Sequence, residues 1–331
     1  MSMMNNEMLF VAWFAYSRRS QLIADKFQMT LHLVHSLKRR RFLVPLRYVL
    51  QAVRTFLILA REKPRLVFVQ NPPIFAAIVA YIYARLWKAQ YIIDSHTGAL
   101  LDPWWKWSLP VHAFLSRRAI TTIVTNAHLK ALVDSWGARS FIIADIPTTF
   151  PQGKPFPLNG KFNIAVINTF SPDEPLEQVL EVAATLPEVQ FYVTGNLKWA
   201  KKSLFENQPA NVTFTGFLPD EEYFGLLRAV QAVMVLTTDD HTMQRGACEA
   251  VSLGKPIITS NWPILRGYFD KGTIHVDNSA HSIEAAVARM QRERAKLERE
   301  IAVLQEQRWQ EWEHKQAKLT ELLQECAQDH G

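Results

Sequence analysis

The chain has 331 residues, of which 48% are hydrophobic and 21% charged, an ordinary globular composition that excludes disordered and fibrous proteins and leaves room for two domains with real cores. Residues 1–150 hold 19 Lys and Arg against 7 Asp and Glu, a balance of +12, whereas the remainder holds 18 against 24, a balance of −6. The two cysteines, Cys248 and Cys326, are too few and too far apart for a disulfide framework or a four-ligand metal site. Both suit a reducing compartment, so we expect a cytoplasmic protein.

We expect no secretory signal, because residues 1–16 lack a basic segment and include Glu7. The longest uncharged run, residues 66–84, is interrupted by Gln70 and by the prolines that follow it. Its uninterrupted part is too short to span a bilayer, so we expect a buried strand followed by a helix. The sequence therefore predicts a soluble or peripheral protein.

Short apolar runs alternate with helical patterns through the first half of the chain. This alternation predicts a parallel sheet with crossover helices, a Rossmann-like domain over residues 1–150. The expected strands are 8–14, 31–35, 65–70, 90–95 and 122–126, and the expected helices are 17–28 with a serine cap, 46–62, 74–87 and 109–118.

Residues 146–161 hold four prolines and two glycines, a composition typical of an interdomain linker. The alternation then restarts and predicts a second Rossmann-like domain, residues 151–282. Its expected strands are 162–168, 189–195, 212–216, 232–238 and 255–260, and its expected helices are 175–186, 220–230 and 246–253. Two such domains in series leave a cleft, to which loops at the carboxyl ends of the strands contribute.

The last segment, residues 283–331, is rich in Glu, Arg, Gln and Lys, and it has no Gly or Pro up to residue 327. Helically spaced apolar residues predict one or two long helices. Because Arg308 and Lys315 interrupt the apolar seam, we expect this segment to pack back across both domains; the alternative is a dimerising coiled coil.

In the basic half of the chain, Lys and Arg alternate with Leu, Val, Phe and Tyr over residues 36–65. Residues 102–118 add three tryptophans beside Lys106. This mixture favours an anionic membrane surface as a partner. The alternative is a solvated helix face with tryptophans in the core. Nucleic acid is not an expected partner, because no helix-turn-helix, zinc-finger or RNP-type pattern is present.

The usual cofactor motifs are missing from the sequence. No G-x-G-x-x-G opens either half, Gly254-Lys255-Pro256 is not a phosphate-binding Walker loop, and no His/Cys cluster has metal-ligand spacing. Dinucleotide dehydrogenases and P-loop NTPases are therefore excluded. We expect no cofactor and no metal.

The stretch "DDHTMQRGACEAVSLGKPIITSN", residues 239–261, leads a polar loop into a helix and then a strand. A helix N-terminus offers free backbone N–H groups and a positive dipole end to a phosphate. An acid one turn inside, Glu249, can accept hydrogen bonds from ribose hydroxyls. Together these features indicate a nucleotide; the alternative is that Glu249 is only a favourable charge in the first helical turn.

Residues 245–261 resemble the donor-site signature of group 1 (family 4-like) glycosyltransferases with the GT-B fold, and similar segments cover the C-terminal half. The N-terminal half is similar only in "YSRRS", "VFVQNPP" and "DSHTGALLD". The resemblance implies an α/β protein of the GT-B class, with two Rossmann-like domains facing a cleft and long C-terminal helices. It also implies a set of donor-binding residues. These are Asn168 and Thr169 at the cleft, Thr194, Gly195, Asn196 and Phe217 for the base, Thr242, Met243, Gln244, Arg245 and Gly246 for the diphosphate and sugar, and Glu249 for the ribose.

Two departures from this family pattern stand out. His241 occupies the place of a second glutamate, and the loop "FSPDEP" lacks the Arg and Lys that usually neutralise the diphosphate. A diphosphate leaving group needs cations or N–H groups as charge develops. We therefore expect Arg245, with Arg18 or Arg19 from the other domain, to take over that role.

Candidate acceptor and catalytic residues lie in N-terminal loops that end strands. Ser17, Arg18 and Arg19 open a helix toward the expected cleft; the alternative is a capped helix start with solvated arginines. Asp94, His96 and Asp102 follow another strand. If the reaction inverts, Asp94 or Asp102 is the expected base and His96 orients the substrate; if it retains, His96 contacts the donor sugar.

The resulting prediction is a metal-independent glycosyltransferase of the hexosyltransferase type, peripheral on the inner face of the cell membrane. It moves a sugar from a UDP- or GDP-sugar to a lipid-linked or glycan acceptor in cell-surface polysaccharide or glycolipid synthesis. Two alternatives stay open: a nucleotide-sugar epimerase on the same fold, and a non-catalytic interaction subunit with a degenerate donor site.

Overall fold

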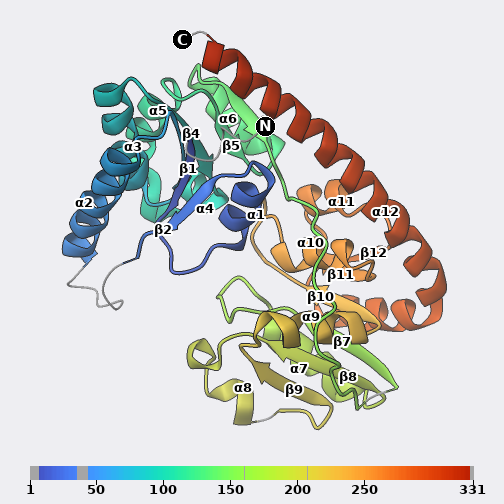
Figure 1. The fold of residues 1–331 in the computed structure, drawn as a ribbon. Helices are drawn as coiled ribbons and strands as arrows, with labels where there is room; N and C mark the ends of the chain where they lie inside the picture. The colour runs from blue at the N-terminus through green and yellow to red at the C-terminus, as the bar shows by residue number, and fades with distance from the viewer. Residues whose placement is uncertain (1–6, 36–43, 160, 207, 329–331) are drawn as a thin grey trace. The chain divides into compact units, whose positions relative to one another are not determined.

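The computed structural model describes residues 7–35, 44–159, 161–206 and 208–328 (Figure 1). The basic run Lys38 to Arg41, part of the predicted membrane-binding stretch, lies outside the described residues. The chain divides into two compact units: unit 1 comprises residues 1–146 with 321–331, and unit 2 comprises residues 147–320.

Unit 1 contains a six-stranded parallel sheet in the order β2-β1-β3-β4-β5-β6. Its strands are β1 (Met8–Ala12), β2 (Thr30–Leu33), β3 (Leu66–Asn71), β4 (Gln90–Ser95), β5 (Thr122–Val124) and β6 (Ser140–Ile142). Its helices within the first 146 residues are α1 (Arg18–Lys26), α2 (Val44–Glu62), α3 (Ile74–Trp87), α4 (Thr97–Leu101), the 3-10 helix η2 (Pro103–Ser108), α5 (Leu109–Ser116) and α6 (Ala127–Ser135).

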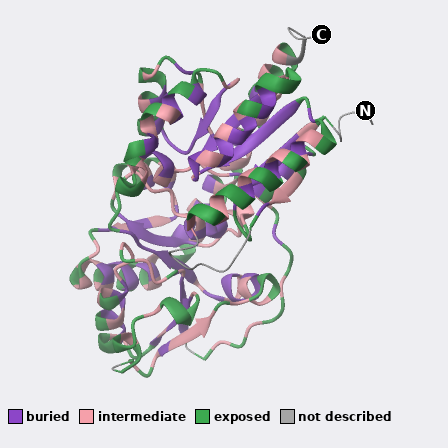
Figure 2. Cartoon of the chain, turned by 90° about the vertical axis from the view of Figure 1, so that its left-hand side faces the viewer, coloured by how far each residue is buried: buried purple, intermediate pink, exposed green. Residues whose placement is uncertain are grey.

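The sheet of unit 1 is covered on both faces, which explains the near-continuous apolar composition of its strands. All six residues of β3 are buried. One face packs against α2, α3 and α5, with Val67, Val69 and Ile93 contributing to that core. Figure 2 shows the strands mostly in purple, the colour of buried residues.

Several N-terminal elements agree closely with the predicted ones. The predicted helix 74–87 is α3 and the predicted strand 90–95 is β4, without a change of bounds. Ser17 caps α1 as expected, because its Oγ accepts a hydrogen bond from the N–H of Ser20 at 3.3 Å. Helix 109–118 was predicted two residues too long, and β6, α4, η2 and α6 were not predicted.

Unit 2 contains a second six-stranded parallel sheet, in the order β12-β11-β10-β7-β8-β9. Its strands are β7 (Phe162–Val166), β8 (Val189–Thr194), β9 (Val212–Gly216), β10 (Ala232–Val235), β11 (Ile257–Ser260) and β12 (Thr273–Val276). Its helices are α7 (Leu176–Thr185), η3 (Leu197–Trp199), α8 (Ser203–Glu206), α9 (Asp220–Ala229), α10 (Arg245–Ser252), α11 (Pro263–Tyr268) and α12 (Ala280–Gln328), which continues into unit 1.

The order of this sheet places the topological switch point between β7 and β10, the strands that start the two winding directions. In such sheets ligands bind beyond the carboxyl ends of the strands at the switch point. The two loops that meet there are residues 167–175 and 236–244, and both belong to the predicted donor domain.

The C-terminal segment forms the single 49-residue helix α12, so the prediction of one or two long helices is confirmed in its simpler form. Leu297, Ile301 and Leu304 are buried in the cores of unit 2. The prediction that the segment packs across both domains stays a prediction.

Candidate functional site

The loops after β7 and β10 are joined by hydrogen bonds at the switch point of unit 2. The hydroxyl of Thr237 donates to Oδ2 of Asp173 at 2.8 Å, and the N–H of Thr238 donates to the carbonyl of Asp173 at 2.7 Å. These contacts hold the "FSPDEP" loop beside the loop that leads into α10. The acids of this loop are therefore part of the site's framework.

The start of α10 lies close to the end of β7, and Gly246 makes that approach possible. A Cβ at position 246 would lie 2.7 Å from Cγ2 and 2.9 Å from Cβ of Ile167. No side chain caps this helix at Gln244. The first turn of α10 thus stands at the switch point, with its positive dipole end at the carboxyl edge of the sheet.

Glu249 is 5% exposed, and two side chains hold its carboxylate. The hydroxyl of Tyr223, from α9, donates to Oε2 at 2.7 Å, and Nε of Arg245 donates to Oε1 at 3.3 Å. Because α10 begins at Arg245, Glu249 lies beyond the first turn, and the alternative of a simple first-turn charge is wrong. A buried, oriented carboxylate is suited to accept hydrogen bonds from vicinal hydroxyls.

Tyr223 was not among the predicted site residues. It lies 26 positions before Glu249, on a different helix, and nothing in the local pattern of "DEEYFGLL" distinguishes it from an ordinary amphipathic tyrosine.

The predicted base-binding residues lie at the ends of β8 and β9, and the predicted cleft residue Asn168 follows β7. Gly195 has φ +124, and a Cβ there would lie 2.5 Å from the carbonyl oxygen of Asn168, so only glycine allows these strand ends to approach. The N–H of Asn168 donates to the hydroxyl of Thr194 at 3.4 Å. Phe217, just after β9, is 77% exposed, and Asn196 caps η3 through its side chain.

Glu174 occupies the N–H groups of the loop after β7. Its carboxylate accepts from the N–H of Thr169 at 2.7 Å, from the hydroxyl of Thr169 at 3.0 Å and from the N–H of Ser171 at 3.0 Å. Burial raises the pKa of Glu174, and these hydrogen bonds offset only part of that effect. The loop thus satisfies its own amides with an acid, in keeping with the absence of Arg and Lys noted in its sequence.

The loop 236–244 leads from β10 to α10 and carries three of the predicted diphosphate residues, and a fourth, Arg245, is the first residue of α10. Thr242, Met243, Gln244 and Arg245 are half-buried. His241 has φ +62, and its Nε2 lies 3.4 Å from Oδ2 of Asp240.

In unit 1, Asp94 lies at the carboxyl end of β4 and is fully buried. Arg19, from the first turn of α1, donates to both carboxylate oxygens of Asp94 at 2.9, 3.1 and 3.2 Å. Burial by itself raises the pKa of Asp94, but the Arg19 guanidinium and a hydrogen bond with His96 outweigh burial and hold it well below its usual range. Asp94 is therefore a weak base and a fixed negative charge.

His96 lies beside this ion pair and is held by two further polar contacts. Its Nε2 lies 3.4 Å from Oδ2 of Asp94 and 3.1 Å from Nε2 of Gln70. The Oε1 of Gln70 in turn accepts from the hydroxyl of Ser20 at 2.9 Å, and the hydroxyls of Ser20 and Ser17 are 2.9 Å apart. Four predicted residues, Ser17, Arg19, Asp94 and His96, thus belong to one network, and Gln70 is a member that the sequence did not single out.

Two predicted residues have different surroundings. Asp102 is exposed, and its carboxylate accepts from the N–H of Trp104 at 2.8 Å, which caps η2. Arg18 is half-buried, with its guanidinium 5.8 Å from the ring centroid of Tyr16. Arg19 is committed to Asp94, and the expectation that Arg18 or Arg19 meets a diphosphate stays a prediction.

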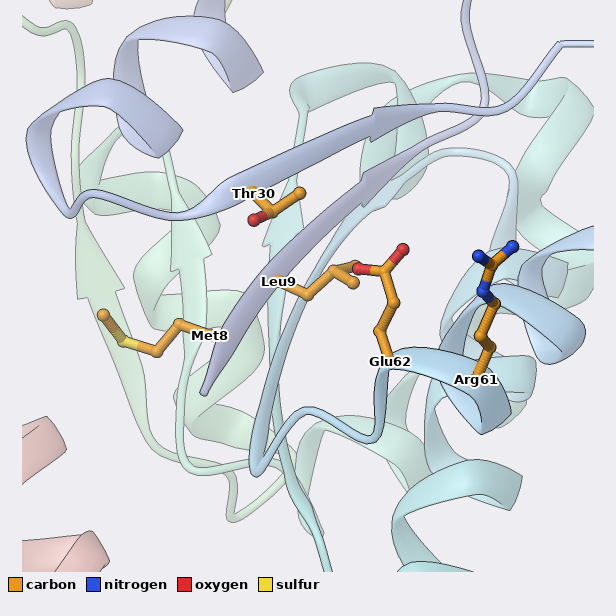
Figure 3. Close-up of a pocket in the computed structure, with 5 residues that line it drawn as sticks. All are labelled: Met8, Leu9, Thr30, Arg61 and Glu62. Atoms are coloured by element: carbon orange, nitrogen blue, oxygen red, sulfur yellow. The ribbon is translucent and has the colours of Figure 1, made fainter. Parts of the chain in front are cut away.

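A pocket of about 280 Å³ lies elsewhere, at the amino ends of β1 and β2 (Figure 3). Met8, Leu9 and Thr30 line it from the strands, and Arg61 and Glu62 from the end of α2. This is the sheet edge opposite the carboxyl ends, so the pocket is not part of the candidate site. Within the described residues, no group of three or more His, Cys, Asp or Glu could hold a metal ion.

Comparison with known proteins identifies relatives for both the sequence and the fold. The family model described as "Glycosyl transferase-like" matches residues 174–324. Human chitobiosyldiphosphodolichol beta-mannosyltransferase is 26% identical over 264 residues, which cover 73% of this chain and 52% of the human protein, and the Pongo abelii protein of the same name is 25% identical over 242 residues. The chain thus spans about half the length of these curated relatives.

Solved structures match nearly the whole chain. A sucrose-phosphate synthase from Thermosynechococcus elongatus has a TM-score of 0.74 and 13% identity, with 98% of this chain and 100% of that chain covered. Anabaena HepE in complex with UDP and glucose has a TM-score of 0.68 and 15% identity, with 96% and 91% covered. The predicted resemblance is therefore confirmed as a similarity: the chain has the GT-B fold, its residues 174–324 match the glycosyl transferase-like family model, and its sequence is similar to that of curated mannosyltransferases.

Proposed function

We propose that this protein is a glycosyltransferase that moves a sugar from a nucleotide diphosphate sugar to a lipid-linked or glycan acceptor. The observation that carries the proposal is the buried carboxylate of Glu249, held by Tyr223 and Arg245 at the switch point of the unit 2 sheet. Tyr223 and Arg245 each donate to one carboxylate oxygen, and each of these oxygens has a second lone pair for a further hydrogen-bond partner. Ribose hydroxyls supply such partners at the position where nucleotides bind in α/β sheets.

In this proposal the donor extends from Glu249 along the carboxyl edge of the sheet. The base lies near Gly195 and Phe217, and the diphosphate lies at the N-terminus of α10 with the guanidinium of Arg245 beside it. Backbone N–H groups and a cation stabilise the negative charge that develops on the leaving diphosphate. The proposal assigns this task to Arg245 and the helix N-terminus, and it includes no metal.

The chemistry on the acceptor side is assigned to His96. Because the pKa of Asp94 is held low by Arg19, Asp94 is poorly suited to remove a proton from an acceptor hydroxyl. We assign Asp94 instead to positioning His96. Both Asp94 and Gln70 contact Nε2 of His96. His96 is then the side chain of this network that meets substrate, since it is partly exposed while Asp94 is not.

The proposed acceptor class rests on the curated relatives, whose name specifies a chitobiosyldiphosphodolichol substrate. A lipid-linked acceptor would bring the enzyme to the cytoplasmic face of a membrane as a peripheral protein. Among the described residues, none of the helices combines the length and the apolar character that crossing a bilayer requires. The proposed donor class rests on Anabaena HepE, which has been solved in complex with UDP and glucose and with UDP-glucose.

The test is a thermal-shift and calorimetry panel with UDP, GDP, ADP and their common sugar forms. Wild type should be stabilised by one nucleotide, and Glu249→Ala should lose that stabilisation. Glu181→Ala is the matched control, since Glu181 is an exposed acid on α7 of the same unit. No stabilisation of wild type by any nucleotide, or equal stabilisation of Glu249→Ala, would contradict the donor site.

Two alternatives are separated by turnover. One structural neighbour is a putative UDP-N-acetylglucosamine 2-epimerase from Listeria monocytogenes, with a TM-score of 0.57 and 9% identity. An epimerase would convert the bound nucleotide sugar without any acceptor, whereas a transferase would release the nucleotide only when an acceptor is supplied. Nucleotide binding with neither reaction would indicate a non-catalytic subunit.

A further inference from the structure

Helix α2 has an unusual distribution of side chains between its inward and outward faces. On the inward face, Gln51 and Thr55 are buried, and they are held by the carbonyl of Val34 at 2.8 Å and by Nε1 of Trp13 at 2.8 Å. The outward face carries five aliphatic side chains, which we call the α2 stripe. They are Leu46, Val49, Leu50, Val53 and Leu57, each 43% to 62% exposed.

A helix that is apolar on its outward face is normally covered by another element. Of the eighteen large hydrophobic side chains that are exposed in the described residues, thirteen belong to unit 1 and five of these form the α2 stripe. Contiguous exposed apolar surface of this kind marks a protein or membrane contact. In Figure 2, which is viewed from the side on which Figure 1 draws α2, green exposed positions run along the helices of this unit.

A row of cations borders the α2 stripe. Arg47, Arg54 and Arg61 recur every seven residues, so they share one face of the helix, next to the side of the stripe occupied by Leu50 and Leu57. Glu62, the last residue of α2, is its single acid. An apolar stripe with a basic border and almost no acid is complementary to an anionic lipid surface.

Aromatic contacts extend the surface from α2 to the tryptophans of η2. The rings of Tyr48 and Phe75 are 4.9 Å apart, and those of Phe75 and Trp107 are 6.0 Å apart. Trp107 is 58% exposed, and Trp104, three residues before it, is 75% exposed beside Lys106. Tryptophans that expose an apolar ring and a polar N–H are favoured at the level of lipid headgroups.

We infer that the α2 stripe, its arginine row and the tryptophans of η2 form the face by which unit 1 docks on an anionic bilayer. The inference rests on the proposed function, because a lipid-linked acceptor gives the enzyme a reason to stay at a membrane. The bilayer is favoured over a second copy of the chain because it accommodates exposed aliphatics, tryptophans and a like-charged row at once. In a symmetric contact between two copies of the chain, the same patch faces itself, so the arginine row of one copy would lie near the arginine row of the other.

The test is co-sedimentation of the full chain with vesicles of phosphatidylglycerol and phosphatidylcholine, compared with vesicles of phosphatidylcholine alone. Val53→Ser/Leu57→Ser should bind the mixed vesicles roughly tenfold more weakly than wild type, because two aliphatic side chains no longer enter the interface. Arg54→Gln/Arg61→Gln should lose roughly fivefold or more and most of the preference for anionic vesicles. Val303→Ser is the matched control, since Val303 on α12 is 49% exposed and Val53 is 51% exposed.

Nucleotide stabilisation, measured on the same proteins, separates this inference from the proposed function. Variants that still bind nucleotide and no longer bind vesicles would support the docking face. The inference would be overturned, with the donor site left intact, if wild type bound nucleotide but not vesicles. It would also be overturned if Val303→Ser lost as much vesicle binding as Val53→Ser/Leu57→Ser. A wild-type dimer that Val53→Ser/Leu57→Ser converts to monomer in sedimentation velocity would also overturn it, in favour of self-association.

Discussion

Replacing Arg19 by methionine tests whether Asp94 is a fixed structural charge. Methionine keeps much of the length and volume of the arginine side chain but removes the three N–H···O contacts of 2.9, 3.1 and 3.2 Å to a carboxylate with no solvent exposure. Removing one partner of a buried ion pair costs about 3–5 kcal/mol, because the remaining charge is left without compensation. His96 stays within 3.4 Å of the carboxylate, so we expect the lower end, about 3 kcal/mol.

The cost should depend on pH. In wild type the pKa of Asp94 is lowered, so the ion pair adds stability above the ordinary carboxyl pKa of about 3.9, and this contribution is lost as the pH falls toward the folded-state value. In Arg19→Met burial acts with little opposition, so the pKa of Asp94 should rise and the carboxyl should take up a proton. The difference in stability between the two proteins should therefore be largest near neutral pH and shrink toward pH 4.

Urea unfolding of wild type, Arg19→Met, Asp94→Asn and the double variant at several pH values provides the measurement. The double variant should be less destabilised than the sum of the two single variants, since neither charge is left alone. A deficit for Arg19→Met below about 1 kcal/mol, or one that does not change with pH, would refute the assignment of Asp94 as a buried, paired anion.

Two further predictions concern unit 2. Gly246→Ala should lower the free energy of unfolding by about 1–3 kcal/mol, because its Cβ would overlap Ile167, whereas Gly267→Ala in α11, where nothing lies within 4 Å, should be neutral or slightly stabilising. Thermal unfolding would distinguish them, and equal shifts would argue against the close approach of α10 and β7. Tyr223→Phe should weaken nucleotide binding roughly 3- to 10-fold by calorimetry, because Glu249 loses the 2.7 Å hydrogen bond that orients it, and unchanged affinity would exclude that role.

The alternating pattern of the chain was sufficient to predict two parallel α/β units and most of their elements. Helix 74–87 and strand 90–95 agree with the structure because each contains an apolar run with clear limits. Pro73 precedes the helix, and polar residues precede and follow the apolar run 91–93 of the strand. Short elements such as β6 and η2 were not predicted. Three to six residues carry too little periodicity to be separated from a loop.

The candidate donor site was predicted as a stretch, and the structure adds the partners that hold it. The sequence places Glu249 on a helix after a polar loop, which is enough to suggest a nucleotide. It does not indicate that Tyr223 and Arg245 hold the carboxylate, or that Glu174 occupies the amides of the loop after β7. Those contacts depend on which strands are neighbours in the sheet.

Local sequence thus determined the elements, the two-unit organisation and the family resemblance, because each depends on residues close together in the chain. Tertiary structure decided the roles of side chains: Arg19 pairs with Asp94 across 75 positions, and α2 turns Leu57 outward while it buries Thr55. The physical reason is that partnership and exposure are set by strand order and helix orientation. The composition of a single segment does not specify either of them.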